Sequence, residues 1–148
     1  MKKIINISIL MALVCAFSFV NISCSDDDDE STKPKITDFE CSPAVNPGKD
    51  LHVETNITAV EKIKRIDVEI HSESDSDYEI NETYTNGKYI DVQNTLFHEH
   101  IDIPQDAPLG EYHLHFTVTD GKGQTTSHKC HIEVTDQLLI HNDDHDDE

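Results

Sequence analysis

Apolar and polar residues alternate along much of the chain between residues 36 and 135, and this pattern restricts the fold more than any other feature. Apolar side chains recur at every second position through large parts of 51–57, 63–70 and 112–118. Successive side chains of a β-strand point to opposite faces, so this alternation predicts strands with one face in a core. No stretch shows the sustained i, i+3, i+4, i+7 spacing of an amphipathic helix. The sequence therefore predicts an all-β fold without helices.

The predicted strands are short, and turn residues separate them. About seven short strands joined by turns indicate an immunoglobulin-like antiparallel β-sandwich. Residues 84–92 are expected to form a weaker strand or a hairpin around Asn86-Gly87. The strand pairing of residues 72–95 stays open. The core tryptophan typical of immunoglobulin domains is absent, because the chain contains no tryptophan.

The glycine-containing turn between the last two strands predicts their register. A three-residue loop sets Leu114 opposite Cys130, so that both side chains point into the core. An even loop would set Leu114 opposite Lys129, which the apolar pattern rejects. The surviving register also brings His113 opposite His131 on the outer face.

Residues 1–23 are predicted to be a cleaved lipoprotein signal. Two lysines precede an apolar run, and a small residue precedes Cys24, which would become the lipidated first residue of the mature chain. A membrane anchor is the alternative, but about 17 apolar residues interrupted by polar ones are short for a membrane span. The acidic run after Cys24 resembles the surface-export signal of Bacteroidetes lipoproteins. That resemblance implies a lipid anchor in the outer membrane and exposure at the cell surface.

The rest of the chain is long enough for one domain. Residues 24–35 are predicted to be an acidic tether, residues 36–136 the β-sandwich domain, and residues 137–148 an acidic tail that contains histidines. The net charge of −19 argues against nucleic acid as a partner and favours cations.

Two cysteines remain in the domain once Cys15 leaves with the signal and Cys24 carries lipid. Cys41 and Cys130 lie near opposite ends of the domain sequence, and an exported protein reaches a compartment in which disulfides persist. We expect them to form a disulfide, with two separate buried thiols as the alternative.

Ten histidines are the second unusual feature of the chain. His98 and His100, like His113 and His115, are two residues apart on predicted strands, so both imidazoles of a pair share one face. In the usual sandwich order the strand ending at His71 lies beside the strand beginning at His113. Outward imidazoles with carboxylates nearby suit a divalent ion such as zinc or copper. The predicted metal ligands are His71, His98, His100, His113, His115 and His131.

The alternative is that these histidines only decorate a solvated polar face. His98 and His100 would lie on the opposite sheet with His52 and Glu54, so one merged site or two separate sites are both open. His141 and His145 resemble a metal-scavenging tail, for which an acidic solubilising tail is the alternative.

Two other kinds of site have weaker support. Acidic residues at positions 73, 75, 77 and 79 crowd one loop, which lacks the glycine and the final glutamate of an EF-hand but, as a loose carboxylate loop, could still bind calcium weakly. The chain has no Gly-x-Ser-x-Gly elbow, phosphate loop or His-Glu-x-x-His helix. We therefore expect no catalytic activity.

Four segments together resemble an uncharacterised family of small Bacteroidetes lipoproteins, a domain of unknown function. They are Val68-Glu-Ile-His71, His98-Glu-His-Ile-Asp-Ile-Pro104, Ala107-Pro-Leu-Gly-Glu-Tyr-His113 and Thr119-Asp-Gly-Lys-Gly123. The resemblance covers roughly residues 24–135 and implies an immunoglobulin-like sandwich in a lipoprotein. The family's histidine pattern is met at His71, His98, His100 and His113.

The sequence thus predicts a surface-exposed, lipid-anchored binding module without catalytic activity. Its partner would be a divalent transition metal, zinc or copper, or it would assist the uptake of a metal or nutrient. The alternative is an adhesion module that contacts a protein or a glycan without bound metal.

Overall fold

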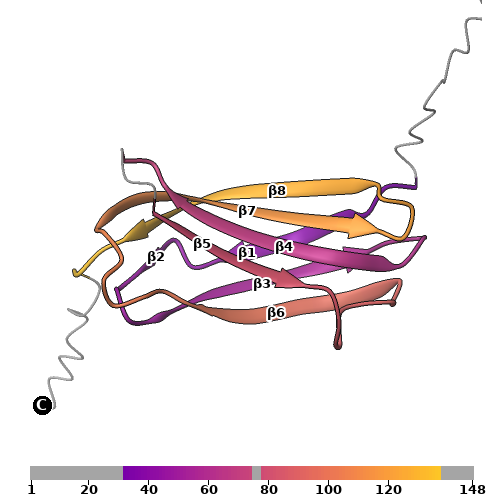
Figure 1. The fold of residues 1–148 in the computed structure, drawn as a ribbon, viewed down its shortest axis with the longest axis horizontal. Helices are drawn as coiled ribbons and strands as arrows, with labels where there is room; N and C mark the ends of the chain where they lie inside the picture. The colour runs from indigo at the N-terminus through magenta and orange to yellow at the C-terminus, as the bar shows by residue number, and fades with distance from the viewer. Residues whose placement is uncertain (1–31, 75–77, 138–148) are drawn as a thin grey trace, which may run out of the picture.

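The computed structural model describes residues 32–74 and 78–137. Eight strands form within these residues, and Figure 1 shows them packed in two layers. In chain order they are β1 (Lys35–Cys41), β2 (Ala44–Val45), β3 (Asp50–Thr58), β4 (Ile63–Ser72), β5 (Glu79–Tyr84), β6 (Asn94–Asp102), β7 (Gly110–Asp120) and β8 (Thr125–Val134). No helix long and apolar enough to cross a membrane occurs in this part of the chain.

The layers are a three-stranded sheet, in the order β1-β3-β6, and a five-stranded sheet, in the order β2-β8-β7-β4-β5. Every strand pair is antiparallel except β2 with β8, which is parallel. The predicted all-β sandwich is confirmed, but the described residues form eight strands rather than about seven, and the larger sheet is mixed. The two residues of β2 are too few to show an alternation in the sequence.

The core lies between the sheets and consists of the inward-facing side chains of the alternating strands. Tyr112, Phe97 and Phe116 are the largest of the fully buried side chains. The rings of Phe97 and Phe116 meet edge to face with centroids 5.0 Å apart, an arrangement that aromatic pairs prefer. The Tyr112 hydroxyl donates a hydrogen bond of 2.8 Å to the Pro108 carbonyl. This contact matches the tyrosine corner of immunoglobulin-like sandwiches.

The predicted β7–β8 register and the predicted antiparallel pairing of the strand ending at His71 with the strand beginning at His113 are confirmed. Leu114 pairs with Cys130, and His113 pairs with His131, as the odd loop requires. The strand that ends beyond His71 lies antiparallel to β7, with His71 directly opposite His113.

The prediction of a strand or hairpin at residues 84–92 is wrong. The strand of this region is β5, which lies earlier in the chain and pairs only with β4. As an edge strand it needs only a partial apolar face, which Ile80 and Tyr84 provide by packing against the core. Their two side chains give a weak signal among polar neighbours.

Residues 85–93 instead form an irregular connection that is anchored at two points. The Asp91 N–H donates to the Ile63 carbonyl and the Ile63 N–H donates to the Val92 carbonyl, each at 2.9 Å. The side chain of Tyr89 is buried, and its hydroxyl donates to the His98 carbonyl at 2.7 Å. The apolar residues of this segment therefore reach the core from a loop.

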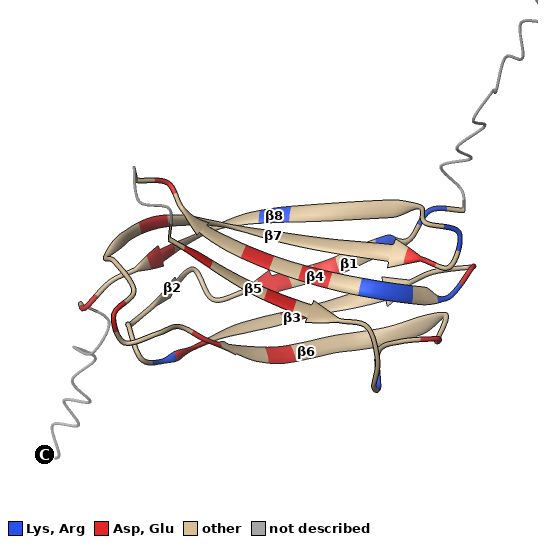
Figure 2. Ribbon diagram, viewed as in Figure 1, with Lys and Arg blue, Asp and Glu red and all other residues tan. Residues whose placement is uncertain are grey.

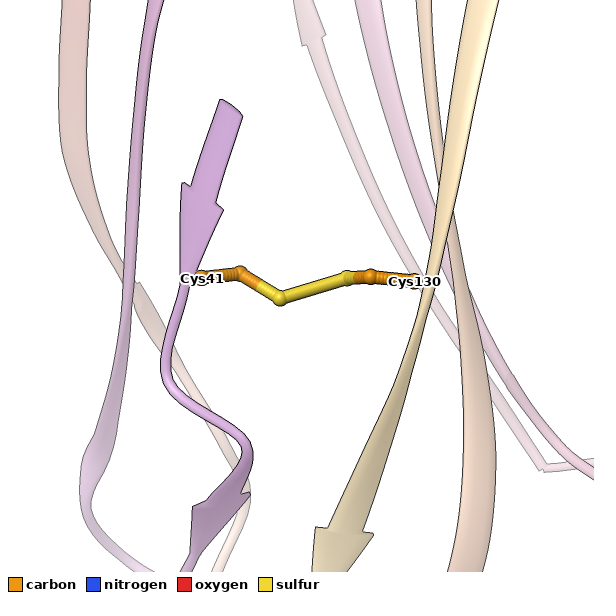
Figure 3. The surroundings of a disulfide bond; sticks show 2 residues. All are labelled: Cys41 and Cys130. Carbon is orange, nitrogen blue, oxygen red and sulfur yellow. A yellow bond between two sulfur atoms is a disulfide. The ribbon is translucent and has the colours of Figure 1, made fainter. Parts of the chain in front are cut away.

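A disulfide between Cys41 and Cys130 joins the two sheets. Figure 3 shows the bond running from β1, in the smaller sheet, to β8, in the larger one. The two cysteines are 89 residues apart in sequence, so the bond closes most of the domain into one loop.

Charged residues are unevenly distributed over the sandwich. In Figure 2, most of the basic segments gather at the end where β4 begins, whereas the charged segments at the end where β4 finishes and β7 begins are mostly acidic. The acidic end is the one that carries the histidine row described next.

Candidate metal sites

Three histidines form a row across the outer face of the five-stranded sheet. His71 of β4 lies opposite His113 of β7, which in turn lies opposite His131 of β8. On β7, both neighbours of His113 are buried in the core, so alternation directs the His113 imidazole outward. Its cross-strand partners His71 and His131 lie on the same face of the sheet. The ring centroids are 5.6 Å apart for His71 and His113 and 4.3 Å apart for His113 and His131.

Glu73 completes a cluster with two members of this row. Its backbone N–H donates to the Glu111 carbonyl at 2.9 Å, which holds the residue beside the beginning of β7. Glu73 Oε1 lies 3.0 Å from His113 Nε2 and 3.1 Å from His131 Nδ1. One ligand atom of each residue lies within 4.8 Å of the others. We call Glu73, His113 and His131 the β7–β8 cluster.

His71 and His115 flank the β7–β8 cluster without joining it. His71 Nδ1 is buried without a hydrogen-bond partner, and Glu69 Oε1 lies 3.5 Å from it. Burial lowers the pKa of His115, and the positive charge of neighbouring Lys129 lowers this pKa further. Both effects favour the neutral form of His115. This residue pairs with Glu69 and Lys129 and does not lie beside Glu73.

A second group of three histidines lies on the outer face of the three-stranded sheet. His52 of β3 is directly opposite His100 of β6, and His98 is two residues away on the same face of β6. The ring centroid of His52 lies 4.9 Å from that of His98 and 5.3 Å from that of His100. The centroids of His98 and His100 are 5.6 Å apart. One nitrogen of each ring lies within 4.8 Å of the other two. We call these residues the β3–β6 cluster.

Two carboxylates support the β3–β6 cluster. Glu54 Oε2 lies 2.5 Å from His98 Nδ1 and 3.8 Å from His52 Nε2. Asp50 is hydrogen-bonded to His100 Nδ1, and this contact holds the pKa of Asp50 below its usual value.

The six predicted ligands therefore divide between two faces of the molecule. Four of them belong to the two clusters: His98, His100, His113 and His131. Because the faces lie on different sheets with the core between them, a single merged site is excluded for these residues. The disulfide partners Cys41 and Cys130 are joined, whereas Cys24, His141 and His145 lie outside the described residues.

Two cluster members were missing from the predicted ligand set. Glu73 was considered only as part of an acidic calcium loop, of which residues 75 and 77 lie outside the described residues. The sequence did offer one signal for Glu73: it lies just beyond the strand that ends near His71, and so close to the predicted histidine row. His52 was recognised as a neighbour of His98 and His100, but β3 and β6 are distant in sequence, so no loop length fixed their register.

The comparisons with known proteins identify a family and a fold. A family described as a domain of unknown function (DUF4625) matches residues 22–135. No curated protein matches the sequence significantly.

Among solved structures, OgpA from Akkermansia muciniphila is 14% identical with a TM-score of 0.52, and the match covers 68% of this chain and 28% of that chain. OgpA in complex with an O-glycopeptide substrate is 15% identical with a TM-score of 0.51, covering 69% and 28%. A Niemann-Pick type C2 protein from Japanese carpenter ant is 11% identical with a TM-score of 0.48, covering 70% and 93%. This chain thus spans under a third of the OgpA chain, and the likeness concerns the β-sandwich alone.

Proposed function

The chain belongs to this family of domains of unknown function, and we propose that it is a non-catalytic module that binds a divalent transition metal at the β7–β8 cluster. The observation that carries the proposal is the position of Glu73 Oε1, 3.0 Å from His113 Nε2 and 3.1 Å from His131 Nδ1. In a tetrahedral zinc site with bonds of about 2.0 to 2.1 Å, neighbouring ligand atoms are about 3.3 Å apart. Two edges of such a tetrahedron are thus nearly formed by side chains already in place.

The donor set favours a borderline metal ion. Two imidazole nitrogens and one carboxylate oxygen suit zinc or copper better than the all-oxygen sites of magnesium and calcium. The strongly negative chain also attracts cations to this end of the sandwich. Three protein ligands leave one coordination position to water or to a ligand from a partner.

The proposed cellular setting of the module rests on the sequence alone. We propose that Cys24 anchors the chain to the outer membrane by lipid and that the domain faces the cell surface, where it assists metal or nutrient uptake. The proposal that it has no catalytic activity rests on the missing catalytic motifs. A glycan- or protein-binding module without metal is the rival, and it predicts no metal affinity at the β7–β8 cluster.

Zinc titration by calorimetry tests this function. The protein is made without a polyhistidine tag and with alanine at His98, His100, His141 and His145, so that other imidazole clusters do not contribute. We expect one zinc ion per chain, and Glu73→Gln should weaken its binding by at least about tenfold because a charged ligand is lost.

Glu69→Gln is the matched control for Glu73→Gln. It removes the same charge from the same face, but Glu69 does not belong to the β7–β8 cluster, so zinc affinity should change by less than about threefold at physiological ionic strength. No zinc binding in the parent, or equal losses in the two variants, would overturn the proposal and favour the interaction module.

A further inference from the structure

The three-stranded sheet carries a histidine group of its own, and its geometry points to a second metal site. We infer that His52, His98 and His100 bind one zinc or copper ion through three imidazole nitrogens, independently of the β7–β8 cluster. The two clusters lie on different sheets, so this inference does not depend on the proposed function of the first.

The spacing of the three rings matches a tetrahedral ion. A zinc–nitrogen bond of about 2.0 to 2.1 Å places the centre of each bound ring about 3.2 Å from the metal, so tetrahedral angles separate ring centres by about 5.2 Å. The observed separations are 4.9, 5.3 and 5.6 Å. The rings therefore form a nearly equilateral triangle of the size that a single ion requires.

The strand geometry explains why this triangle forms. Directly opposite residues of antiparallel strands have neighbouring Cβ atoms, and residues two apart on a strand share a face. His52 and His100 form the cross-strand pair, and His98 supplies the third ring from the same strand as His100. All three stand on regular strands, within a ladder of nine residue pairs, rather than on a loop.

The carboxylates select the tautomer that a metal needs. His98 Nδ1 and His100 Nδ1 are each hydrogen-bonded to a carboxylate, Glu54 and Asp50 respectively. An acidic acceptor at Nδ1 keeps the proton there and leaves the lone pair of Nε2 available. Metal-bound histidines commonly have such a carboxylate partner, which orients the ring and raises its basicity. Two of the three rings in the β3–β6 cluster are held in this way.

The site would keep one open coordination position at an accessible surface. The side chains of His98 and His100 are 49% and 55% exposed, so a bound ion can be approached from solvent. Three neutral nitrogen ligands and an exposed fourth position suit an ion that is exchanged with another ligand, rather than a closed structural site. The ligand class is thus a divalent ion of the zinc or copper kind, with water or an external donor completing its shell.

Zinc stoichiometry separates the two sites. In untagged protein with His141→Ala and His145→Ala, we expect two zinc ions per chain by calorimetry. The pair His98→Ala and His100→Ala should remove one ion, the pair His113→Ala and His131→Ala should remove the other, and the combination should remove both. Circular dichroism checks that each variant remains folded, and His128→Ala, a histidine outside both clusters, should leave the count at two.

Copper bound to the β3–β6 cluster provides a direct count of its ligands. In the His113→Ala, His131→Ala protein, the electron paramagnetic resonance spectrum of one equivalent of Cu²⁺ should show coupling to three nitrogens. A spectrum with one nitrogen or none would contradict the assignment even if the stoichiometry agreed.

Asp50 and Asp102 offer a matched pair for the role of the carboxylates. They lie directly opposite each other on β3 and β6, and only Asp50 contacts a ring of the cluster. Asp50→Asn should weaken zinc binding at this site by about 10- to 100-fold without changing the stoichiometry, the usual loss when a histidine's outer partner is removed. Asp102→Asn should change zinc affinity by less than about threefold, since it alters only a screened charge.

Two results would overturn the inference. One is a parent protein that binds a single zinc ion, lost with His113 and His131 but unaffected by alanine at His98 and His100; this outcome would leave the proposed function intact. The other is equal behaviour of Asp50→Asn and Asp102→Asn. A parent protein that binds a single zinc ion, lost with His98 and His100 but unaffected by alanine at His113 and His131, would have the opposite meaning. It would refute the β7–β8 site and support the β3–β6 site.

Discussion

The chemistry of a histidine in this protein depends on what lies beside it across the sheet. His131 is 76% exposed and contacts Glu73, so it belongs to the β7–β8 cluster for which metal binding is proposed. His128, three residues earlier on the same strand, stacks on the Phe39 ring with centroids 4.3 Å apart and serves packing. The number of histidines was visible in the sequence, but this division of roles required their neighbours.

Tyr84 gives the protein a pH dependence that can be measured. Its ring packs against Phe97 at a centroid distance of 5.2 Å, and burial, with a smaller contribution from the charges of Glu99 and Glu82, raises its pKa from 10 to about 12. The folded state therefore keeps the tyrosine proton at pH values where the unfolded state releases it. The resulting stabilisation is complete below pH 10 and is lost as the pH rises towards 12.

We expect Tyr84→Phe to reduce this loss. Full linkage over the pKa change would correspond to about 2.7 kcal/mol, but the side chain is partly exposed, so an effect of about 1 kcal/mol is expected. Urea unfolding at pH 9 and pH 11 measures it. Tyr78→Phe is the control, because the Tyr78 ring packs against Tyr112 but its pKa is raised less strongly. If the free energy of unfolding of Tyr84→Phe differed between pH 9 and pH 11 by as much as that of the parent, the assignment would be contradicted.

At the scale of strands, the sequence predicted the β7–β8 register from a local loop and the β4–β7 pairing from the usual sandwich order, but it did not fix the β3–β6 register. The β7–β8 register followed from one odd loop and the apolar pattern, and it correctly placed His113 opposite His131. The pairing of β3 with β6 joins segments about 45 residues apart, so His52 could not be aligned with His100 by loop length. The predicted strand or hairpin at 84–92 was placed too late in the chain, because β5 is an edge strand and needs few apolar residues to be stable.

The turn between β7 and β8 docks onto the turn between β3 and β4, and Gly121 makes this approach possible. Its N–H donates to the carbonyls of Glu61 and Lys62 at 3.2 and 3.0 Å. A Cβ at Gly121 would lie 2.5 Å from the Glu61 carbonyl oxygen, closer than atoms tolerate. The backbone of one turn must therefore shift if any side chain is added here.

Gly121→Ala is expected to destabilise the protein by about 1 to 3 kcal/mol, the usual cost of overpacking at a site that cannot relax freely. The neighbouring Lys122→Ala removes only the exposed ion pair with Glu61 and should cost about 0 to 1 kcal/mol. Urea unfolding compares the two variants. Equal stabilities would show that the turns separate without cost and that their contact does not hold the sheets in place.

At the scale of the whole molecule, the sandwich carries one histidine cluster on the outer face of each sheet, with the core between them. Along β6 and β7 the buried residues alternate with exposed or partly exposed ones, so the outer faces of both sheets are available for imidazoles and carboxylates. Binding at one face therefore need not disturb the other. This arrangement could be predicted from alternation alone, whereas which residues share a cluster depended on the registers.

The disulfide is a covalent cross-link between the two sheets in addition to the chain connections, and its contribution to stability can be predicted. It joins Cys41 and Cys130 across 89 residues, so it restricts most of the unfolded domain. The loop-closure model gives about 4 to 5 kcal/mol for a loop of this length. A domain of this size is stable by about 5 to 15 kcal/mol in total, so its removal should leave the protein close to unfolding.

We expect the double variant Cys41→Ala, Cys130→Ala to lose several kcal/mol of unfolding free energy in urea. Alanine at both positions avoids a free thiol and leaves only a small space, since both side chains are half-buried. Reductant provides the control: it should shift the unfolding midpoint of the parent to that of the variant and leave the variant unchanged. A loss below about 1 kcal/mol would mean that the unfolded chain is already compact enough for the link to restrict little, so that the packing between the sheets, rather than the covalent bond, holds the two faces together.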